Sequence, residues 1–435
     1  MKKAFTEVIT EADFLDLAQE HSQNFLKIYN SLSSEQKPRT RRFYARLIEE
    51  SEELESFLDD HCARENKTWQ LFGELVACIR NLAKVAFILK HILNRYPAYS
   101  LSDKQFDKIL CESKDISAFL DKTIMSLFDD AKKESSRLGI KFPAETLEED
   151  LFMEIYPQKR LPYTLDEEED LNDRKGAAKI ASLYLNMIER YEFFKWHRIK
   201  GTSDDNENFI PEKVNEERAR ELIAIIHNLQ STYDHDIKNT PLELQDEALK
   251  IFRSYISMPL HLLNIVNWLA HLCQRHLGTT GFAKGRDALS AIIDKSRLAD
   301  IIKDFALYYI NGFLQTGKLL AGEILAKYVE IETCAIKVPE GLGFHLRPAN
   351  LIAKLSRHYG TDLRLIVDGK EYDAGSVLSV TLAAGFIARK GYKEVRFRGD
   401  SRVLRDLRLL SEYNFGEDKK GSPATLPTEL SYLWT

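Results

Sequence analysis

The sequence predicts an α+β protein in which a large all-α region, residues 1–329, precedes a small α+β region, residues 330–418. Two observations lead to this prediction. Apolar residues recur every three or four positions through most of the first region, which is the period of amphipathic helices. In the second region, short alternating segments rich in branched residues are interleaved with helical segments in the order βαββαβα.

The helical region is interrupted by a segment whose composition is unlike that of a helix. Residues 143–174 contain three prolines and a run of five acidic residues, which is typical of a loop or linker. We therefore expect two helical subdomains, over residues 1–142 and 175–329. The clearest single helix is Thr68–Tyr96, which ends directly before Pro97.

The elements of the second region follow one another closely. A strand over residues 331–338 leads to a helix that begins near Pro348, whose missing amide suits a first helical turn. Asp368-Gly369 predicts a two-residue hairpin turn. The remaining expected elements are strands over residues 361–367, 370–373 and 393–398, a helix that starts within 374–380, and a helix over 401–410. We expect residues 419–435 to form a flexible tail.

One histidine, His345, stands just ahead of a predicted helix N-terminus, within Gly343-Phe344-His345-Leu346-Arg347-Pro348-Ala349. Free backbone amides and the helix dipole favour negative charge at such a place. A phosphoryl group on this imidazole would also lie within reach of the Arg347 guanidinium. The amides expected to meet that group are those of Ala349, Asn350 and Leu351. This arrangement suits a histidine that carries phosphate.

The pattern Gly-x-His-x-Arg-Pro-Ala after a first strand resembles the active-site loop of HPr, the phosphocarrier of the bacterial phosphoenolpyruvate-dependent phosphotransferase system. The similarity covers residues 330–418 and implies an HPr-like open-faced β-sandwich. It also implies that His345 is phosphorylated on a ring nitrogen and that Arg347 steadies the phosphoryl group. The implied partners are an Enzyme I-type donor and a phosphoryl acceptor or regulated protein, with no cofactor. Such a carrier need not be an enzyme in its own right, because catalysis would be shared with the partner.

The resemblance assigns two further features. Ser376 matches a serine that is phosphorylated for regulation in some members, although a helix N-cap is a sufficient structural reason for a serine there. Phe344, Val377 and Leu378, together with Ala349, would form an apolar patch that binds partners. Thr381 departs from the family, in which a methionine is common at that position of the patch.

The large helical region favours a regulatory role, in which it responds to the phosphorylation state of the carrier region. Two alternatives remain open. In one, the carrier region is degenerate and serves only as a docking module. In the other, residues 1–329 are themselves an enzyme or ligand sensor that the carrier region switches, which requires a pocket with convergent polar groups such as His261 and His271.

A basic stripe follows the predicted helix Thr68–Tyr96. Its members share one face at about 100° per residue. They are Arg80, Lys84, His91 and Arg95. The stripe suits a phosphorylated ligand, an acidic partner or the carrier region, but a solvated face of an amphipathic helix has the same pattern.

Composition excludes several other classes of protein. The chain has 61 basic and 67 acidic residues and a net charge of −6, which gives no basic surface for nucleic acid. Its five cysteines contain no Cys-x-x-Cys pair or zinc pattern, so we expect no metal site and a reducing, cytoplasmic location. No signal peptide and no uncharged apolar run of membrane-spanning length is evident, so we expect no membrane insertion.

Overall fold

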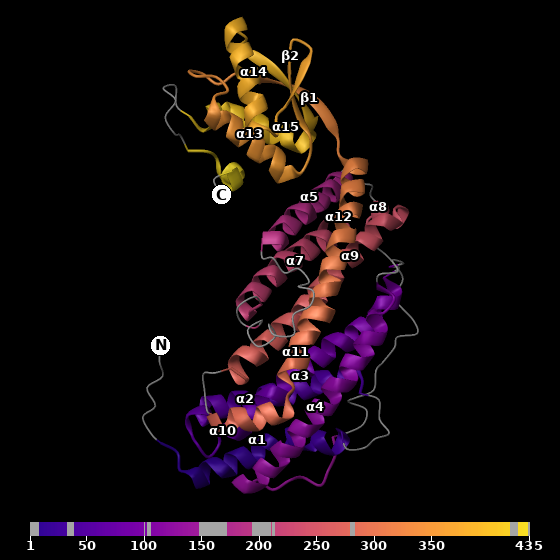
Figure 1. Cartoon of the computed structure of the whole chain (residues 1–435), viewed down its shortest axis with the longest axis vertical. Helices are drawn as coiled ribbons and strands as arrows, with labels where there is room; N and C mark the ends of the chain where they lie inside the picture. Colours follow the sequence, from indigo (N-terminus) through magenta and orange to yellow (C-terminus); the bar gives the residue numbers. More distant parts are fainter. Residues whose placement is uncertain are drawn as a thin grey trace. The chain divides into compact units, whose positions relative to one another are not determined.

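The chain is described by a computed structural model, which covers residues 8–32, 39–99, 101, 106–147, 172–193, 210, 214–278, 283–417 and 425–433. It is mostly helical, with one small antiparallel sheet near the C-terminus (Figure 1), so the α+β prediction is confirmed. The chain forms two compact units, each assembled from three segments. The first consists of Met1–Leu165, Phe194–His227 and Ser254–Leu314, and the second of Asp166–Phe193, Asn228–Arg253 and Gln315–Thr435.

These units divide the chain differently from the predicted boundaries. The expected subdomain 175–329 is shared between them, because helices α7 (Glu216–Asp236), α9 (Glu247–His271) and α12 (Tyr308–Tyr328) each contribute to both units. Most of the expected linker 143–174 lies outside the described residues, and its last residues belong to a helix that begins at Asn172.

The first unit contains a four-helix bundle in which each helix contacts the next and α1 closes on α4. Thr40 begins α2 as a side-chain cap that accepts a hydrogen bond from the amide of Phe43. Within the bundle, Phe25 of α1 stacks on Phe128 of α4. The described helices that lie wholly in the first unit are α1 (Glu11–Leu32), α2 (Arg41–Asp60), η1 (Ala63–Glu65), α3 (Gln70–Arg95), η2 (Tyr96–Ala98), α4 (Ile109–Leu138), η7 (Leu272–His276), α10 (Ala283–Ile292), α11 (Lys295–Asp300) and η8 (Ile301–Leu307), and α1 to α4 form the bundle.

The second unit combines helices α5 and α8 with all of the C-terminal elements. The order of these C-terminal elements is the expected βαββαβα. The unit contains α5 (Asn172–Phe193), α8 (Pro241–Gln245), β1 (Ile331–Lys337), α13 (Leu346–Tyr359), β2 (Leu363–Val367), β3 (Lys370–Asp373), α14 (Val377–Lys390), β4 (Glu394–Asp400), α15 (Ser401–Glu412), η9 (Asn414–Gly416) and η10 (Thr428–Leu433).

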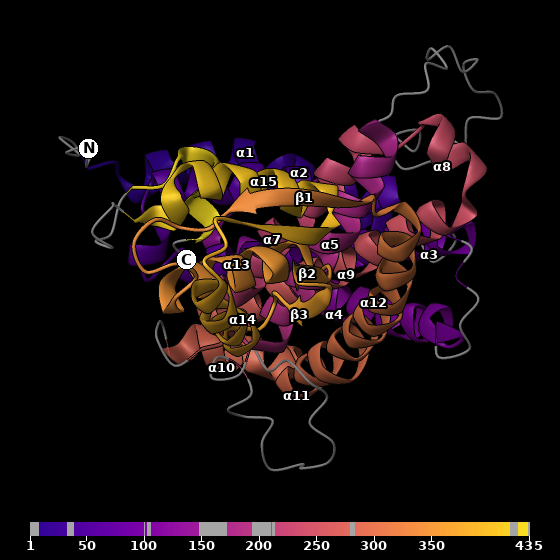
Figure 2. The same cartoon turned by 90° about the horizontal axis from the view of Figure 1, so that it is seen from above.

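The sheet has the strand order β1-β4-β2-β3, with every neighbouring pair antiparallel. Buried residues alternate with more accessible ones along β2 and β4, because only one face of the sheet is covered. Figure 2 shows this sheet from above, where β1 runs beside α15. Asp368 and Gly369 adopt φ values of 49° and 77°, so the predicted hairpin turn is confirmed.

The C-terminal segment packs on the core, so the prediction of a flexible tail is wrong for its described part, residues 425–433. Leu430 and Leu433 of η10 are buried in the same apolar core as the sheet. The Tyr432 hydroxyl donates to Asp406 at 2.7 Å, and Lys354 donates to the carbonyl of Leu433 at 3.0 Å. Apolar side chains spaced along a short segment are enough to hold it against the domain.

Candidate functional site

His345 occupies the N-cap position of α13, with an extended backbone at φ −72° and ψ −169°. Its carbonyl accepts the first helical hydrogen bond, from the amide of Ala349 at 3.0 Å. Gly343, with φ +64°, turns the chain into this position, and its carbonyl accepts from the His345 amide at 2.8 Å. The backbone therefore fixes His345 at the helix end while its side chain remains 29 % exposed.

The imidazole of His345 is held by a buried carboxylate. Its Nε2 atom lies 2.8 Å from Oε2 of Glu417, whose side chain is only 1 % exposed. The guanidinium of Arg347 lies 3.3 Å from the other oxygen, Oε1, as an ion pair. Oε1 accepts no hydrogen bond within the described part of the chain. A buried carboxylate needs such compensation, so Glu417 ties His345 and Arg347 into one cluster.

The hydrogen bond to Glu417 selects a tautomer of the imidazole. A carboxylate only accepts hydrogen bonds, so the Nε2 atom of His345 carries the hydrogen. In the neutral ring, the lone pair is then on Nδ1. Because Nε2 faces Glu417, Nδ1 is the nitrogen of His345 that can act as a nucleophile.

A turn with an unusual backbone conformation positions Glu417 next to His345. Asn414, Phe415 and Gly416 have consecutive positive φ values of 46°, 57° and 71°. Such values are costly for a bulky residue and tend to occur at functional sites. The Asn414 side chain accepts from the amide of Glu340 at 2.8 Å and donates to the Glu417 carbonyl at 3.2 Å. The turn is thus fastened to the loop that carries His345.

An aromatic contact fastens the same two segments. Phe344 is buried and meets Phe415 edge to face, with ring centroids 5.3 Å apart. Phe344 also contacts Phe397 of β4. Because Phe344 precedes His345 and Phe415 lies two residues before Glu417, this contact sets the histidine opposite the carboxylate.

Sequence reasoning missed Glu417. It lies 72 positions from His345, and no local pattern pairs the two residues. The only signal was the turn-forming composition of Asn414 and Gly416 after the closing helix.

The predicted amide contacts need correction. The Ala349 amide is already bonded to the His345 carbonyl, and Asn350 and Leu351 follow inside α13, where each amide has an acceptor one turn back. The helix begins at Leu346 rather than after Pro348, so by position the first-turn amides before Ala349, which include that of Leu346, have no intrahelical acceptor.

The predicted partner-binding patch also needs correction. Phe344 and Ala349 are buried, and Val377 packs partly against the core. Only Leu378 is exposed as expected. The exposed leucines of this region are Leu342, Leu346, Leu378 and Leu382. Ser376 is the N-cap of α14, and its hydroxyl accepts from the Ser379 amide at 3.4 Å; its phosphorylation stays a prediction.

The basic stripe on α3 is not an open ligand surface. Arg80 forms an ion pair with Glu55 of α2 at 2.8 Å, and Lys84 lies over the ring of Trp268. His91 packs against His261, with ring centroids 4.4 Å apart. Arg95 is exposed at the end of the helix. The stripe mainly joins helices of the first unit, so neither a free binding surface nor a fully solvated face describes it.

The polar residues of α9 are likewise engaged. His261 contacts His91, and Nδ1 of His271 lies 3.1 Å from the Glu216 carboxylate. Burial lowers the pKa of His271, against the raising effect of Glu216. Both histidines therefore serve packing between helices in the first unit.

Two properties of the described residues bear on other functions. Within them, no group of three or more histidine, cysteine or acidic side chains is arranged to hold a metal ion. One helix, Glu247–His276, is long and apolar enough to cross a membrane by length and composition, and 72 % of its most apolar window is buried, as in a core helix.

Comparison with known proteins found no match. No protein-family model, no curated protein and no solved structure is similar to this chain.

Proposed function

We propose that the C-terminal region is an HPr-like phosphocarrier domain in which His345 accepts a phosphoryl group and passes it on. Three observations support the proposal. The observed βαββαβα order and the half-covered antiparallel sheet agree with an open-faced β-sandwich. His345 stands at a helix N-terminus, where anions are favoured. The single observation that supports it most is the hydrogen bond from His345 to the buried Glu417.

This hydrogen bond determines which ring nitrogen of His345 attacks in the proposed phosphoryl transfer. The lone pair on Nδ1 of His345 attacks phosphorus in the phosphohistidine of the donor. The phosphorus–nitrogen bond of the donor breaks, and its electron pair returns to the donor imidazole. The acceptor ring becomes positively charged while Nε2 keeps its hydrogen, and Glu417 stabilises that charge as a carboxylate does beside a catalytic histidine.

Arg347 can pair with two anionic groups, the Glu417 carboxylate and a phosphoryl group on His345. Its guanidinium now pairs with Glu417 at 3.3 Å, and its exposed fraction of 40 % leaves it accessible from solvent. A phosphoryl group on the neighbouring histidine offers it charge-assisted hydrogen bonds that are stronger than this ion pair. We therefore assign Arg347 to the phosphoryl group in the phosphorylated state.

A regulatory role for the helical region remains part of the proposal. Helix α13 carries His345 at its beginning and meets α5 at its end, where the Asn186 amide donates to the carbonyl of His358 at 2.6 Å. This connection lies within the second unit and gives a helix of the all-α region direct contact with the proposed carrier domain.

The experiment that tests the proposal is incubation of the full chain with Enzyme I and radiolabelled phosphoenolpyruvate. We expect acid-labile label on the wild type and none on His345→Ala. His358→Ala is the matched control, because this histidine lies on the same helix at its other end, and it should be labelled like the wild type. Absence of label on a folded wild type, with a donor active on ordinary HPr, would favour docking through the exposed leucines instead.

A further inference from the structure

A second candidate site lies at the far end of α13 from His345. An open cavity of about 660 Å³ lies between α5, the C-terminal end of α7 and the ends of α13 and α15, and all of its lining belongs to the second unit. Its volume is in the range of small-molecule sites. With about 1.5 Å of rise per helical residue, the 14-residue α13 separates it from His345 by roughly 20 Å.

The cavity is lined by basic side chains from two opposed helices. Lys175 and Lys179 come from α5 and lie one turn apart, and Arg402 and Arg405 come from α15 with the same relation. The only acidic residue of the lining within the described chain is Asp236, which pairs with Lys179 at 3.0 Å. Four cations against one carboxylate make this an environment for an anion.

The acids that accompany the arginines do not line the cavity. Asp400 and Asp406 are buried and form ion pairs with Arg402 and Arg405, and Asp406 lines a neighbouring pocket. Lys175 has a loose and accessible partner, Glu330, at 3.8 Å, and such exposed pairs contribute little. Of the four cations, Arg402 is held in a buried ion pair, whereas Lys175, Lys179 and Arg405 remain accessible to a ligand.

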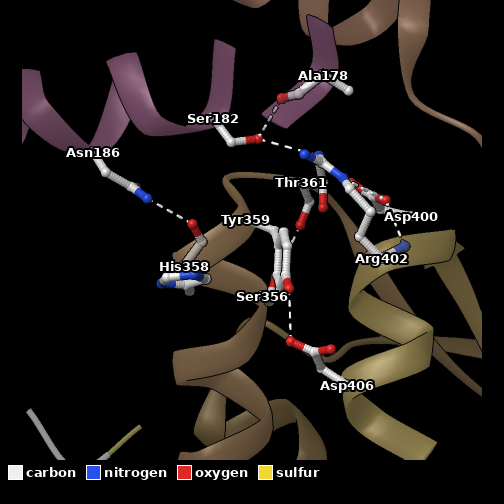
Figure 3. A network of polar contacts seen from close by, with 10 residues as sticks. All are labelled: Ala178, Ser182, Asn186, Ser356, His358, Tyr359, Thr361, Asp400, Arg402 and Asp406. Carbon is white, nitrogen blue, oxygen red and sulfur yellow. Dashed lines mark hydrogen bonds and ion pairs between the residues drawn. The ribbon is translucent and has the colours of Figure 1, made fainter. Parts of the chain in front are cut away.

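Figure 3 shows Arg402 between Ser182 of α5 and Asp400 at the end of β4. The side chain of Arg402 is nine-tenths buried, its Nε bonds to Asp400 at 3.1 Å, and its Nη2 reaches the Ser182 hydroxyl of α5 at 3.2 Å. The remaining nitrogen, Nη1, is buried and has no hydrogen-bond acceptor among the described residues. Because Nη1 is not accessible from the cavity, Arg402 would attract an anion through its charge and not through a hydrogen bond from this nitrogen.

We propose that this cavity binds a small molecule with two phosphate groups. One group is bound by the lysine pair of α5 and the other by the arginine pair of α15, while the ring of Tyr359, which lies under the Arg402 guanidinium at 5.2 Å, supports the part between them. The bound molecule bridges α5 to α15 and thereby fixes the carrier region on α5. This site stands apart from His345, so it does not depend on the proposed phosphotransfer.

The test is calorimetric titration of the full chain with inorganic pyrophosphate and, separately, with inorganic phosphate. Binding of pyrophosphate at least tenfold tighter than of phosphate is expected. Lys179→Gln and Arg405→Gln should each weaken pyrophosphate binding at least tenfold, while Lys179→Arg and Arg405→Lys should retain it. Circular dichroism of each variant checks that it is folded.

Two controls make the outcome decisive. Lys370→Gln removes an exposed cation of β3 away from the cavity, and His345→Ala removes the proposed phosphorylation site; both should bind pyrophosphate like the wild type. The proposal is overturned if the wild type does not bind pyrophosphate, if phosphate binds equally well, or if Lys370→Gln weakens binding as much as Lys179→Gln.

Discussion

His345 and Glu417 lie 72 positions apart in the chain, yet Nε2 of the imidazole is 2.8 Å from a carboxylate that is almost completely buried. A buried carboxylate that accepts a hydrogen bond from an imidazole fixes both the orientation and the tautomer of the ring. Phosphotransfer through His345 should therefore depend on Glu417 as a positioning residue.

Replacement of Glu417 tests this dependence. We expect Glu417→Ala to slow phosphorylation of His345 about 10- to 100-fold, by analogy with the loss of the hydrogen-bond partner of a metal-bound histidine. Glu417→Gln should slow it less, because its amide oxygen still accepts from Nε2. The rate of labelling by Enzyme I and phosphoenolpyruvate measures both effects, and Glu412→Gln, on an exposed acid of α15, should match the wild type. A rate for Glu417→Ala equal to that of the wild type would rule out this role.

The contact between Phe344 and Phe415 should hold the two segments together. Phe415→Ala removes a fully buried ring and should lower the stability of the C-terminal region by about 3–5 kcal/mol. Hydrogen exchange of the β1 and β4 amides measures that loss. Tyr413→Ala, at an exposed ring of the same turn, should change it by no more than about 0.5 kcal/mol. Equal effects of the two variants would contradict the proposed anchoring.

Docking of the C-terminal segment should depend on one partly buried hydroxyl, that of Tyr432. Tyr432 donates to Asp406, and burial together with this carboxylate raises the pKa of Tyr432. Tyr432→Phe keeps the ring stacked on His358 but leaves Asp406 one donor short, so η10 should dock about 1–2 kcal/mol more weakly. Faster proteolysis near η10 is the readout, with Tyr413→Phe as control; unchanged proteolysis would show that the apolar contacts suffice.

The lowered pKa of His91 predicts that the folded protein is less stable in acid. Burial, assisted by the charges of Arg41 and Arg95, lowers the pKa of His91 from 6.5 to about 4. The folded state then binds fewer protons than the unfolded state between these values, so the contribution is present above pH 6.5 and is lost as the pH falls toward 4. Because the ring is only half-buried, we expect about 1 kcal/mol.

Thermal unfolding between pH 4 and 7 measures this contribution. His91→Phe keeps an aromatic ring against His261 and should lose less stability on acidification than the wild type. His227→Phe, at an exposed histidine, should follow the wild type. Identical pH profiles for His91→Phe and the wild type would contradict the prediction.

Local patterns predicted the secondary structure of the C-terminal region well. The alternation of its strands, the Asp368-Gly369 turn and the proline near the start of α13 are all short-range signals, and the structure contains each of them. The tail was mispredicted because glycine and proline were given more weight than the apolar residues Leu430 and Leu433.

Long-range relationships could not be predicted in the same way. His345 was found from its place before a helix, but Glu417 reaches it only through a turn with three positive φ angles and the contact of two buried rings. The prediction of a binding surface on α3 was wrong for a similar reason. Helical spacing shows which residues share a face, but it does not show that a neighbouring residue such as Glu55 covers that face.

The position of the phosphoryl group on the imidazole tests the central claim most directly. Phosphoramidate phosphorylates histidine without a partner protein, and ¹⁵N NMR of the full chain then shows which ring nitrogen of His345 carries phosphorus. Because Oε2 of Glu417 lies 2.8 Å from Nε2 and accepts its hydrogen, the result expected is phosphorylation at Nδ1. Phosphorylation at Nε2, or none at His345 in the folded protein, would contradict the account.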